Sequence, residues 1–299
     1  MITSFSPGYI TGFFKVNHSK NQLLTGSTGA GVCLEKGVET TVDALPSNKF
    51  KLRININGVP YPNAIVSKSV VNQMINHSNF QHEIVINHFV NIPILSGYGS
   101  SGSSALSLSY ALNELLNLGF TKTEAAQKAH IAEIYCRTGL GTVLGAYHGG
   151  VQIRSHPGAP GIGKVRQIPV GNNKVVVSFT SGSLSTSNIL NNQKLIKLIN
   201  MAGKNSLQHL TNDPSPDKFL ELSRNFSLQI NFFPSEFYKF MKLADRFDMT
   251  CSMNLFGNSL FSILNINETN EFYNLFLKSN ITGHILFSPI NHTGARVID

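Results

Sequence analysis

The segment from Pro93 to Ala105 (PILSGYGSSGSSA) contains the residue types needed to bind a phosphate group. Gly97, Gly99 and Gly102 allow backbone N–H groups to approach an anion closely. The serines between them offer hydroxyls to phosphate oxygens or Mg²⁺, and the N-terminus of a following helix attracts negative charge. We therefore predict a phosphate-binding loop here; a helix cap rich in Ser and Gly, with no ligand, is the alternative that fits the same pattern.

Two nucleotide-binding motifs match short segments of the chain, but the residues or elements that must follow each motif are absent. The spacing of the three glycines satisfies GxGxxG, but a helical pattern follows where a dinucleotide-binding unit needs a strand ending in an acidic residue. The segment from Gly158 to Lys164 matches GxxxxGK, but Val165 stands where a Mg²⁺-binding Ser or Thr is needed. Pro160 also argues against a helix beginning there. The sequence thus excludes a NAD site and a Walker loop.

The patterns around the loop predict the elements that hold it. Residues alternate from Phe50 to Asn57 as in a half-buried strand, and a second strand is expected from Glu83 to Val90. Leucines at helical spacing predict a helix from Ser103 to Leu118. A capping box at Thr121 opens a second helix that ends near Thr138. The loop should therefore lie between a strand and a pair of helices.

The rest of the chain reads as α+β. The Gly- and Pro-rich stretch 139–163 is expected to be ordered loop with a short strand, and a strand is expected at 174–179. Helical periodicity appears in 186–203, 215–225, 234–247 and 268–278, with short strands at 227–232 and 283–288. We place a domain boundary between the two halves, with one domain at 1–168 and the other at 169–299.

The charge composition indicates which kinds of partner the protein binds. The 299 residues include 24 Lys+Arg and 16 Asp+Glu, a net charge of +8 that favours anionic ligands. The densest basic patch alternates along a strand at Lys49, Lys51 and Arg53, which is weaker than the stripe expected of a nucleic-acid-binding face. No export signal or membrane-length apolar run is found, and the three cysteines are far apart. We expect a cytoplasmic protein with reduced thiols that binds neither nucleic acid nor membrane.

The segment Pro93 to Ala105 resembles the Pro-x3-Gly-x-Gly-x-Ser-Ser-Ala motif of the GHMP kinases, which include galactokinase and the homoserine and mevalonate kinases. Within this superfamily the chain is similar to the archaeal pantoate kinase family. The resemblance runs through nearly the whole chain, in the segments 6–14, 26–32, 132–133, 137–141, 149–154, 157–163, 252–257 and 294–299.

The resemblance implies a two-domain GHMP kinase fold of α+β and α/β type. Its N-terminal domain would be α/β and similar to a ribosomal protein domain, and its C-terminal domain would be ferredoxin-like. The implied reaction is ATP-dependent phosphorylation of pantoate for coenzyme A biosynthesis, with Mg²⁺ as cofactor, ATP and pantoate meeting at the domain cleft, and a homodimer left open. A related nucleotide-binding protein without turnover, or a kinase for another small alcohol such as homoserine or mevalonate, remains the alternative.

The resemblance also assigns candidate residues. The phosphates of ATP would be bound by Pro93, Gly97, Gly99, Ser100, Ser101, Gly102 and Ser103. Ser101 and Glu133 would bind Mg²⁺, although a helix cap and a solvated carboxylate are the plainer interpretations of the same residues. Thr142 stands where the family has an aspartate that deprotonates or orients the acceptor hydroxyl, and a threonine can only hydrogen-bond it.

Four further residues are candidates for the acceptor side. A guanidinium binds a carboxylate in bidentate fashion, so Arg154 is our first candidate for the pantoate carboxylate and Arg137 the second. A structural arginine that bonds loop carbonyls is the alternative. Ser27 and Thr28 lie in a Gly-rich segment and would contact the acceptor or stabilise the turn.

Overall fold

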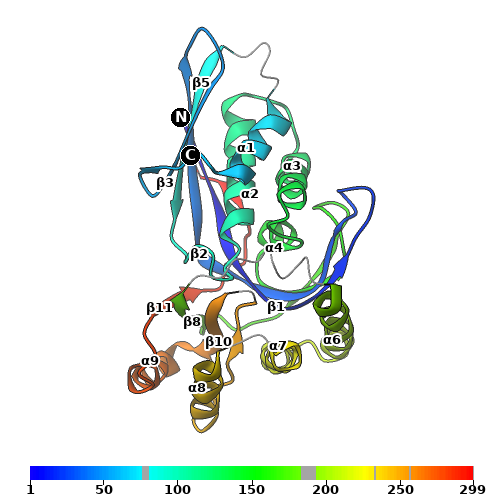
Figure 1. Ribbon diagram of the computed structural model, residues 1–299, viewed down its shortest axis with the longest axis vertical. Coiled ribbons are helices and arrows are strands. Elements are labelled where there is room, and N and C mark those ends of the chain that lie inside the picture. Colours follow the sequence, from blue (N-terminus) through cyan, green and yellow to red (C-terminus); the bar gives the residue numbers. More distant parts are fainter. Residues whose placement is uncertain (76–80, 183–192, 232–233, 256, 299) are drawn as a thin grey trace.

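Two β-sheets form the framework of the computed structural model, which describes residues 1–75, 81–182, 193–231, 234–255 and 257–298. The larger sheet and four helices on one of its faces fill the upper part of Figure 1, and the smaller sheet lies below them. This mixed architecture of two sheets and packed helices fits the two-domain fold that the resemblance implies.

The larger sheet consists of eight strands in the described residues, with the order β12-β1-β2-β5-β3-β4 and with β6 pairing with β2 and β7. Only β3 and β5 pair in parallel, because α1 connects them as a crossover. The strands are β1 (Ile2–Asn17), β2 (Gly26–Pro46), β3 (Lys51–Ile56), β4 (Val59–Pro60), β5 (His82–Val90), β6 (Val151–His156), β7 (Lys164–Ile168) and β12 (Arg296–Val297).

The long hairpin of β1 and β2 curves away from the rest of the sheet and is covered on both faces (Figure 1). Both faces are buried over most of its length, so polar and apolar residues do not alternate there. Bulges follow Pro7 and Thr11 in β1 and bend the strand. The pairing places the middle of β1 beside the first half of β2, and β6 pairs with β2 at the same place.

Four helices pack on one face of the larger sheet: α1 (Ile65–Met74), α2 (Ser100–Leu115), α3 (Lys122–Cys136) and α4 (Thr142–His148). The leucine stripe of α2 and the alanine face of α3 enter one hydrophobic core, since small side chains let these helices approach closely. The capping box at Thr121 and Glu124 is present and begins α3. These helices position the loops that follow.

The smaller sheet has the order β11-β8-β10-β9 and carries helices on both faces. Its strands are β8 (Lys174–Gly182), β9 (Ser252–Met253), β10 (Asn258–Asn265) and β11 (His284–Pro289). Phe179 of β8 packs against aromatic rings of α8 (Ser235–Asp245) and α9 (Thr269–Lys278), the second of which follows the short helix η2 (Ile266–Glu268). On the other face, α6 (Gln193–Asn212) and α7 (Pro216–Ile230) pack against β1, so a single core cluster joins the two sheets.

Several expected elements need correction. The stretch 139–163 contains the helix α4 besides the expected strand, because Val143, Leu144 and Ala146 form a buried helical face between the glycines. The strand expected at 227–232 is wrong, because residues 227–230 belong to the helix α7, which ends at Ile230. Residues 232–233 lie outside the described residues. Of the helix expected at 186–203, residues 186–192 lie outside the described residues; α6 runs from Gln193 to Asn212, beyond the expected end. The elements expected at 83–90, 121–138, 268–278 and 283–288 are confirmed.

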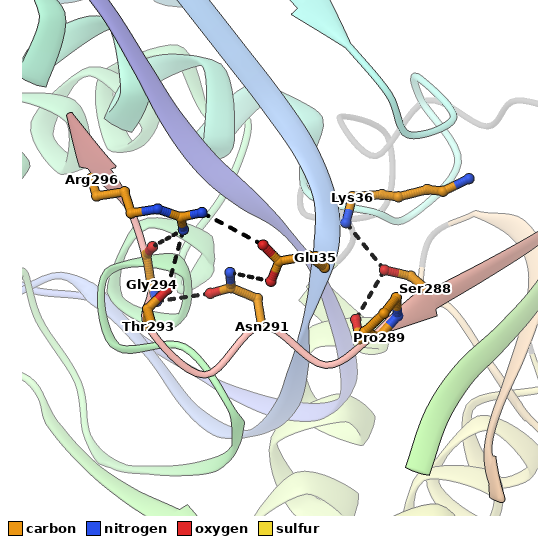
Figure 2. Close-up of polar contacts among 8 residues, drawn as sticks. All are labelled: Glu35, Lys36, Ser288, Pro289, Asn291, Thr293, Gly294 and Arg296. Atoms are coloured by element: carbon orange, nitrogen blue, oxygen red, sulfur yellow. Dashed lines mark hydrogen bonds and ion pairs between the residues drawn. The ribbon is translucent and has the colours of Figure 1, made fainter. Parts of the chain in front are cut away.

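The last residues of the chain return from the smaller sheet to the larger one (Figure 2). Asn291 donates to Glu35 Oε2 over 2.6 Å, and its side-chain oxygen accepts from the N–H of Gly294 over 2.8 Å. Arg296 lies 3.5 Å from the same glutamate before β12 pairs with β1. The N–H of Ala295 also donates to the carbonyl of Ala146 in α4. The C-terminal segment thus contacts both β2 and α4.

Among the helices of the described ranges, none combines the length and apolarity needed to cross a membrane. Cys33, Cys136 and Cys251 all carry free thiols, as the sequence predicts.

Candidate active site

The predicted phosphate loop connects β5 to α2 and is held by close packing on both sides. Gly97 and Gly99 have φ values of 86° and 68°, a conformation that favours glycine. A Cβ at Gly97 would lie 2.8 Å from the side chain of Asn254, and one at Gly99 would lie 2.6 Å from the methyl group of Thr142. Gly99 is the N-cap of α2, so the free N–H groups of the first helical turn point to the same space. This geometry suits an anion.

The serines of the loop differ in what their hydroxyls contact. Ser103 Oγ donates to the carbonyls of Pro7 and Gly99, over 2.7 Å and 3.1 Å, so its side chain fixes α2 to β1. Ser101 Oγ is buried, and in the described part of the chain it has no hydrogen-bond partner. Ser100 is partly exposed at the start of α2, and Pro93 is partly exposed at the start of the loop. Among these side chains, Ser101 is the one suited to meet a ligand.

Glu133 reaches this loop from the last turn of α3. Its Oε1 accepts from Thr138 Oγ1 over 3.1 Å, while Oε2 is buried without a partner among the described residues. Oε2 packs against Gly139, and a Cβ at Gly102 would lie 2.5 Å from it. Burial raises the pKa of Glu133 to about 7, and the hydrogen bond from the Thr138 hydroxyl offsets part of that rise.

Ser101 and Glu133 fit a bound Mg²⁺ ion. A hydroxyl and a carboxylate oxygen are the hard ligands that Mg²⁺ prefers, and here both are buried without partners in the described residues. No group of three or more His, Cys, Asp and Glu that could hold a metal occurs among the described residues. The protein would therefore supply only part of the coordination, as is usual where phosphate oxygens and water supply the rest.

A cavity opens between the phosphate loop, the start of α4, the middle of β1 and the start of β2. Its lining residues are Tyr9, Thr11, Phe14, Ser27, Gly97, Gly99, Thr138, Gly139, Leu140, Gly141, Thr142 and Leu255. Thr142, the first residue of α4, reaches it from beside Gly99 and Gly102. None of these lining residues is Asp or Glu, so the lining provides no carboxylate base. We call this space the acceptor cavity.

Arg154 lies fully buried in β6 behind the wall of the acceptor cavity. Its guanidinium donates to Tyr9 Oη and, over 3.5 Å, to Ser27 Oγ, and it lies 5.2 Å from the centroid of the Tyr9 ring. Burial lowers the pKa of Arg154 to about 10, and its Nε has no partner among the described residues. No described carboxylate forms an ion pair with it. A buried cation of this kind is costly unless an anion joins it.

The structure brings Arg154 and Ser27 together but places the other two acceptor-side candidates elsewhere. Thr28 follows Ser27 in β2, with a buried hydroxyl that lacks a partner in the described residues. Arg137 ends α3 with φ of 56° and is exposed. It lines a neighbouring cavity with His18, Gln22 and Thr25, which shares Gly139 and Leu140 with the acceptor cavity.

A further cavity lies on the other side of the phosphate loop. We call it the base cavity, after the nucleobase that we propose for it below. Ser100, Ser101, Ser104 and Thr138 line one end, and Thr138 lines the acceptor cavity as well. The remainder is mostly apolar and is lined by Ile56, Tyr61, Asn63, Ala64, Ile65, Val66, Ser67, His88, Val90, Ile94 and Leu95. The loop thus lies between two cavities whose linings share Thr138.

Sequence reasoning assigned no role to three residues of these walls. Tyr9, Ser67 and His88 become relevant only through the contacts of β1, α1 and β5, and no local motif marks them. Tyr9 lies in a segment that resembles the family, which was the one available signal.

Comparisons with known proteins agree with this geometry. Residues 64–150 match the family model for the GHMP kinases N terminal domain. A pantoate kinase of Methanocaldococcus jannaschii is 33% identical over 95% of this chain and 100% of its own, and one of Thermococcus kodakarensis is 30% identical over 94% and 93%. A solved structure titled as a phosphotransferase related to the CoA biosynthesis pathway has a TM-score of 0.91 at 28% identity, covering 99% of this chain and 98% of that one.

Proposed function

Because the chain belongs to the pantoate kinase family of the GHMP kinases, we propose that it transfers the γ-phosphoryl group of ATP to the terminal hydroxyl of pantoate. The product would be 4-phosphopantoate, an intermediate on the route to coenzyme A.

The observation that carries this proposal is the buried guanidinium of Arg154 beside the acceptor cavity. Its described partners are two hydroxyls, from Tyr9 and Ser27, so it retains a positive charge that no described carboxylate neutralises. The carboxylate of pantoate would neutralise it by a charge-assisted hydrogen bond. With the acid end of pantoate there, its hydroxyl end would face Thr142 and the phosphate loop.

ATP would lie across the phosphate loop with its base in the base cavity. The triphosphate would accept hydrogen bonds from the first turn of α2, and Ser101 and Glu133 would hold Mg²⁺ against it. When bound, the metal ion neutralises charge on the phosphate oxygens. The acceptor cavity and the base cavity share Thr138, which supports a direct path between the two substrates.

The transfer requires positioning more than a strong base. The pantoate oxygen bonds to the γ-phosphorus, the bond from that phosphorus to the β,γ-bridging oxygen breaks, and ADP leaves with the electron pair. The hydroxyl proton passes to solvent. Since phosphoryl transfer proceeds through a loose transition state, little proton removal is needed before the bond forms. Thr142 would orient the hydroxyl by a hydrogen bond, and Arg154 would fix the other end of the acceptor.

Phosphorus NMR of the purified protein with ATP, Mg²⁺ and pantoate tests this proposal. We expect ADP and one phosphomonoester of pantoate to appear together. Homoserine and mevalonate serve as rival acceptors in parallel reactions. If ATP is bound but neither consumed nor transferred to pantoate, the nucleotide-binding protein without turnover becomes the better account. If homoserine or mevalonate is phosphorylated faster than pantoate, the acceptor assignment is wrong.

A further inference from the structure

A chain of buried hydrogen bonds connects the base cavity to the phosphate-binding helix. Ser67 Oγ lies 2.9 Å from His88 Nε2, and His88 Nδ1 lies 2.8 Å from Thr40 Oγ1. Thr40 Oγ1 lies 2.6 Å from Ser107 Oγ, which donates to the carbonyl of Ser103 over 2.9 Å. All four side chains are buried, and Ser67 and His88 also line the base cavity.

The direction of each bond in this chain is determined by its carbonyl end. A carbonyl only accepts, so the single hydrogen of Ser107 is used there, and Ser107 accepts from Thr40. The hydrogen of Thr40 is then also used, so Thr40 accepts from His88, whose Nδ1 carries the proton. Burial lowers the pKa of His88 to about 4, which keeps its ring neutral at pH 7. Its Nε2 is therefore an acceptor.

The consequence falls on Ser67. Its single hydrogen is donated to His88 Nε2, so its oxygen presents only lone pairs to the base cavity. Away from the phosphate-loop end, the lining is apolar except for Asn63, Ser67, His88 and the phenol of Tyr61, and Tyr61 is exposed. Asn63 is exposed, whereas Ser67 is 4% exposed, so a base that meets Ser67 makes that contact out of water.

We propose that Ser67 is a specificity-determining acceptor that selects nucleotides whose base carries an amino group over those with an oxo group at the same edge. This inference rests on the proposed ATP-dependent function, since it places the base of that nucleotide in the base cavity. The 6-amino group of adenine donates to Ser67 Oγ. The 6-oxo group of hypoxanthine or guanine places two acceptors face to face, and both lose their hydrogen bonds. His88 and Thr40 act as positioning residues that fix the hydrogen of Ser67.

The test compares MgATP with MgITP, which differ at the 6 position, by calorimetry without acceptor. The native protein should bind MgATP about ten- to hundredfold more tightly. Ser67→Ala should bring the two dissociation constants within about threefold of each other. Ser109→Ala is the matched control, because it also removes a buried helix hydroxyl, bonded to Leu106, that lines neither cavity.

A second variant acts on Ser67 from a distance. Thr40→Val removes the acceptor of His88 Nδ1, which permits the tautomer protonated at Nε2 and frees the hydrogen of Ser67 to point into the cavity. Affinity for MgITP should then rise relative to MgATP, although residue 40 does not line the cavity. Equal affinities in the native protein, or an unchanged preference in Ser67→Ala, would overturn the proposal. Because no acceptor is present, failure to phosphorylate pantoate would refute the proposed function without deciding base selection.

Discussion

Arg154 shows how a residue can serve binding at the expense of stability. A buried charge without a charged partner lowers the stability of the folded state, and a hydrophobic residue of similar volume often restores it. We predict that Arg154→Met leaves the free energy of unfolding unchanged or raises it by about 1–2 kcal/mol. The same change should raise KM for pantoate by a factor of about 10–100, through loss of a charge-assisted bond, with little change in the affinity for ATP.

Urea unfolding and steady-state kinetics provide the two measurements for Arg154→Met. Arg53→Met is the control, because Arg53 forms an ion pair with Glu83 at the surface and lines none of the cavities described above. A variant that unfolds several kcal/mol more easily while keeping its KM would show that Arg154 is a structural arginine.

Glu133 should make both stability and metal binding depend on pH. Its pKa is about 7 in the folded protein and 4.5 as an ordinary value, so between these pH values the folded form keeps a proton that the unfolded form has released. The free energy of unfolding of the metal-free protein should therefore fall by about 3 kcal/mol as pH rises through this window. Affinity for Mg²⁺ with a nonhydrolysable ATP analogue should rise over the same window, because the ion needs the carboxylate.

Glu133→Gln should remove both effects, measured by urea unfolding at pH 5 and pH 7 and by calorimetry at pH 6 and pH 8. Glu124→Gln is the comparison, because this glutamate lies on the same helix but is exposed in a capping box that lowers its pKa. Retention of the native pH dependence in Glu133→Gln would mean that another group controls the ion.

At the scale of elements, α2 begins at Gly99, a position that needs glycine for two reasons: its positive φ and the lack of space for a Cβ. Gly99 and Gly119 both have positive φ beside this helix, but only at Gly99 would a Cβ meet other atoms, namely Thr142 and Tyr9. We predict that alanine at either position costs about 1 kcal/mol of stability through backbone strain. Gly99→Ala should also weaken nucleotide affinity at least tenfold, since the loop must move to admit the methyl group.

Calorimetry with the ATP analogue distinguishes the two glycine variants, and thermal unfolding shows whether each is folded. Equal nucleotide affinity in Gly99→Ala and Gly119→Ala would indicate that the loop does not bind phosphate.

An element can be predicted from the sequence when its own residues carry a periodic pattern or a cap. The strand at β5 and the helix α3 are recognisable, because each carries its own period or cap. The long strands β1 and β2 lack alternation, since both of their faces are buried, and α4 is concealed by the glycines around it. The Gly- and Ser-rich loop is a local motif, so its place between a strand and a helix was predictable. Tyr9 of β1 lines the acceptor cavity and Ser67 of α1 lines the base cavity, and only the fold places them there.

At the scale of the whole molecule, the two sheets share one of the three core clusters found in the described residues. Phe13 of β1 packs against Phe219 and Phe226 of α7, and the cluster continues to Phe261 of the smaller sheet. The returning C-terminal segment adds a polar connection through Asn291 and Glu35 (Figure 2). The two sheets should therefore lose their structure in one cooperative transition, because neither keeps a complete core without the other.

Asn291→Ala tests this coupling. Asn291 is 1% exposed, and its loss leaves the Gly294 N–H and the Glu35 carboxylate without their partner, so we expect a loss of about 2–3 kcal/mol. Arg296→Ala, which removes a half-exposed ion pair to the same glutamate, should cost less than about 1 kcal/mol. Hydrogen exchange followed through urea unfolding would report β5 and β10 separately. In Asn291→Ala both strands should become unprotected at the same lower urea concentration, whereas a change confined to the larger sheet would show that the sheets unfold as separate domains.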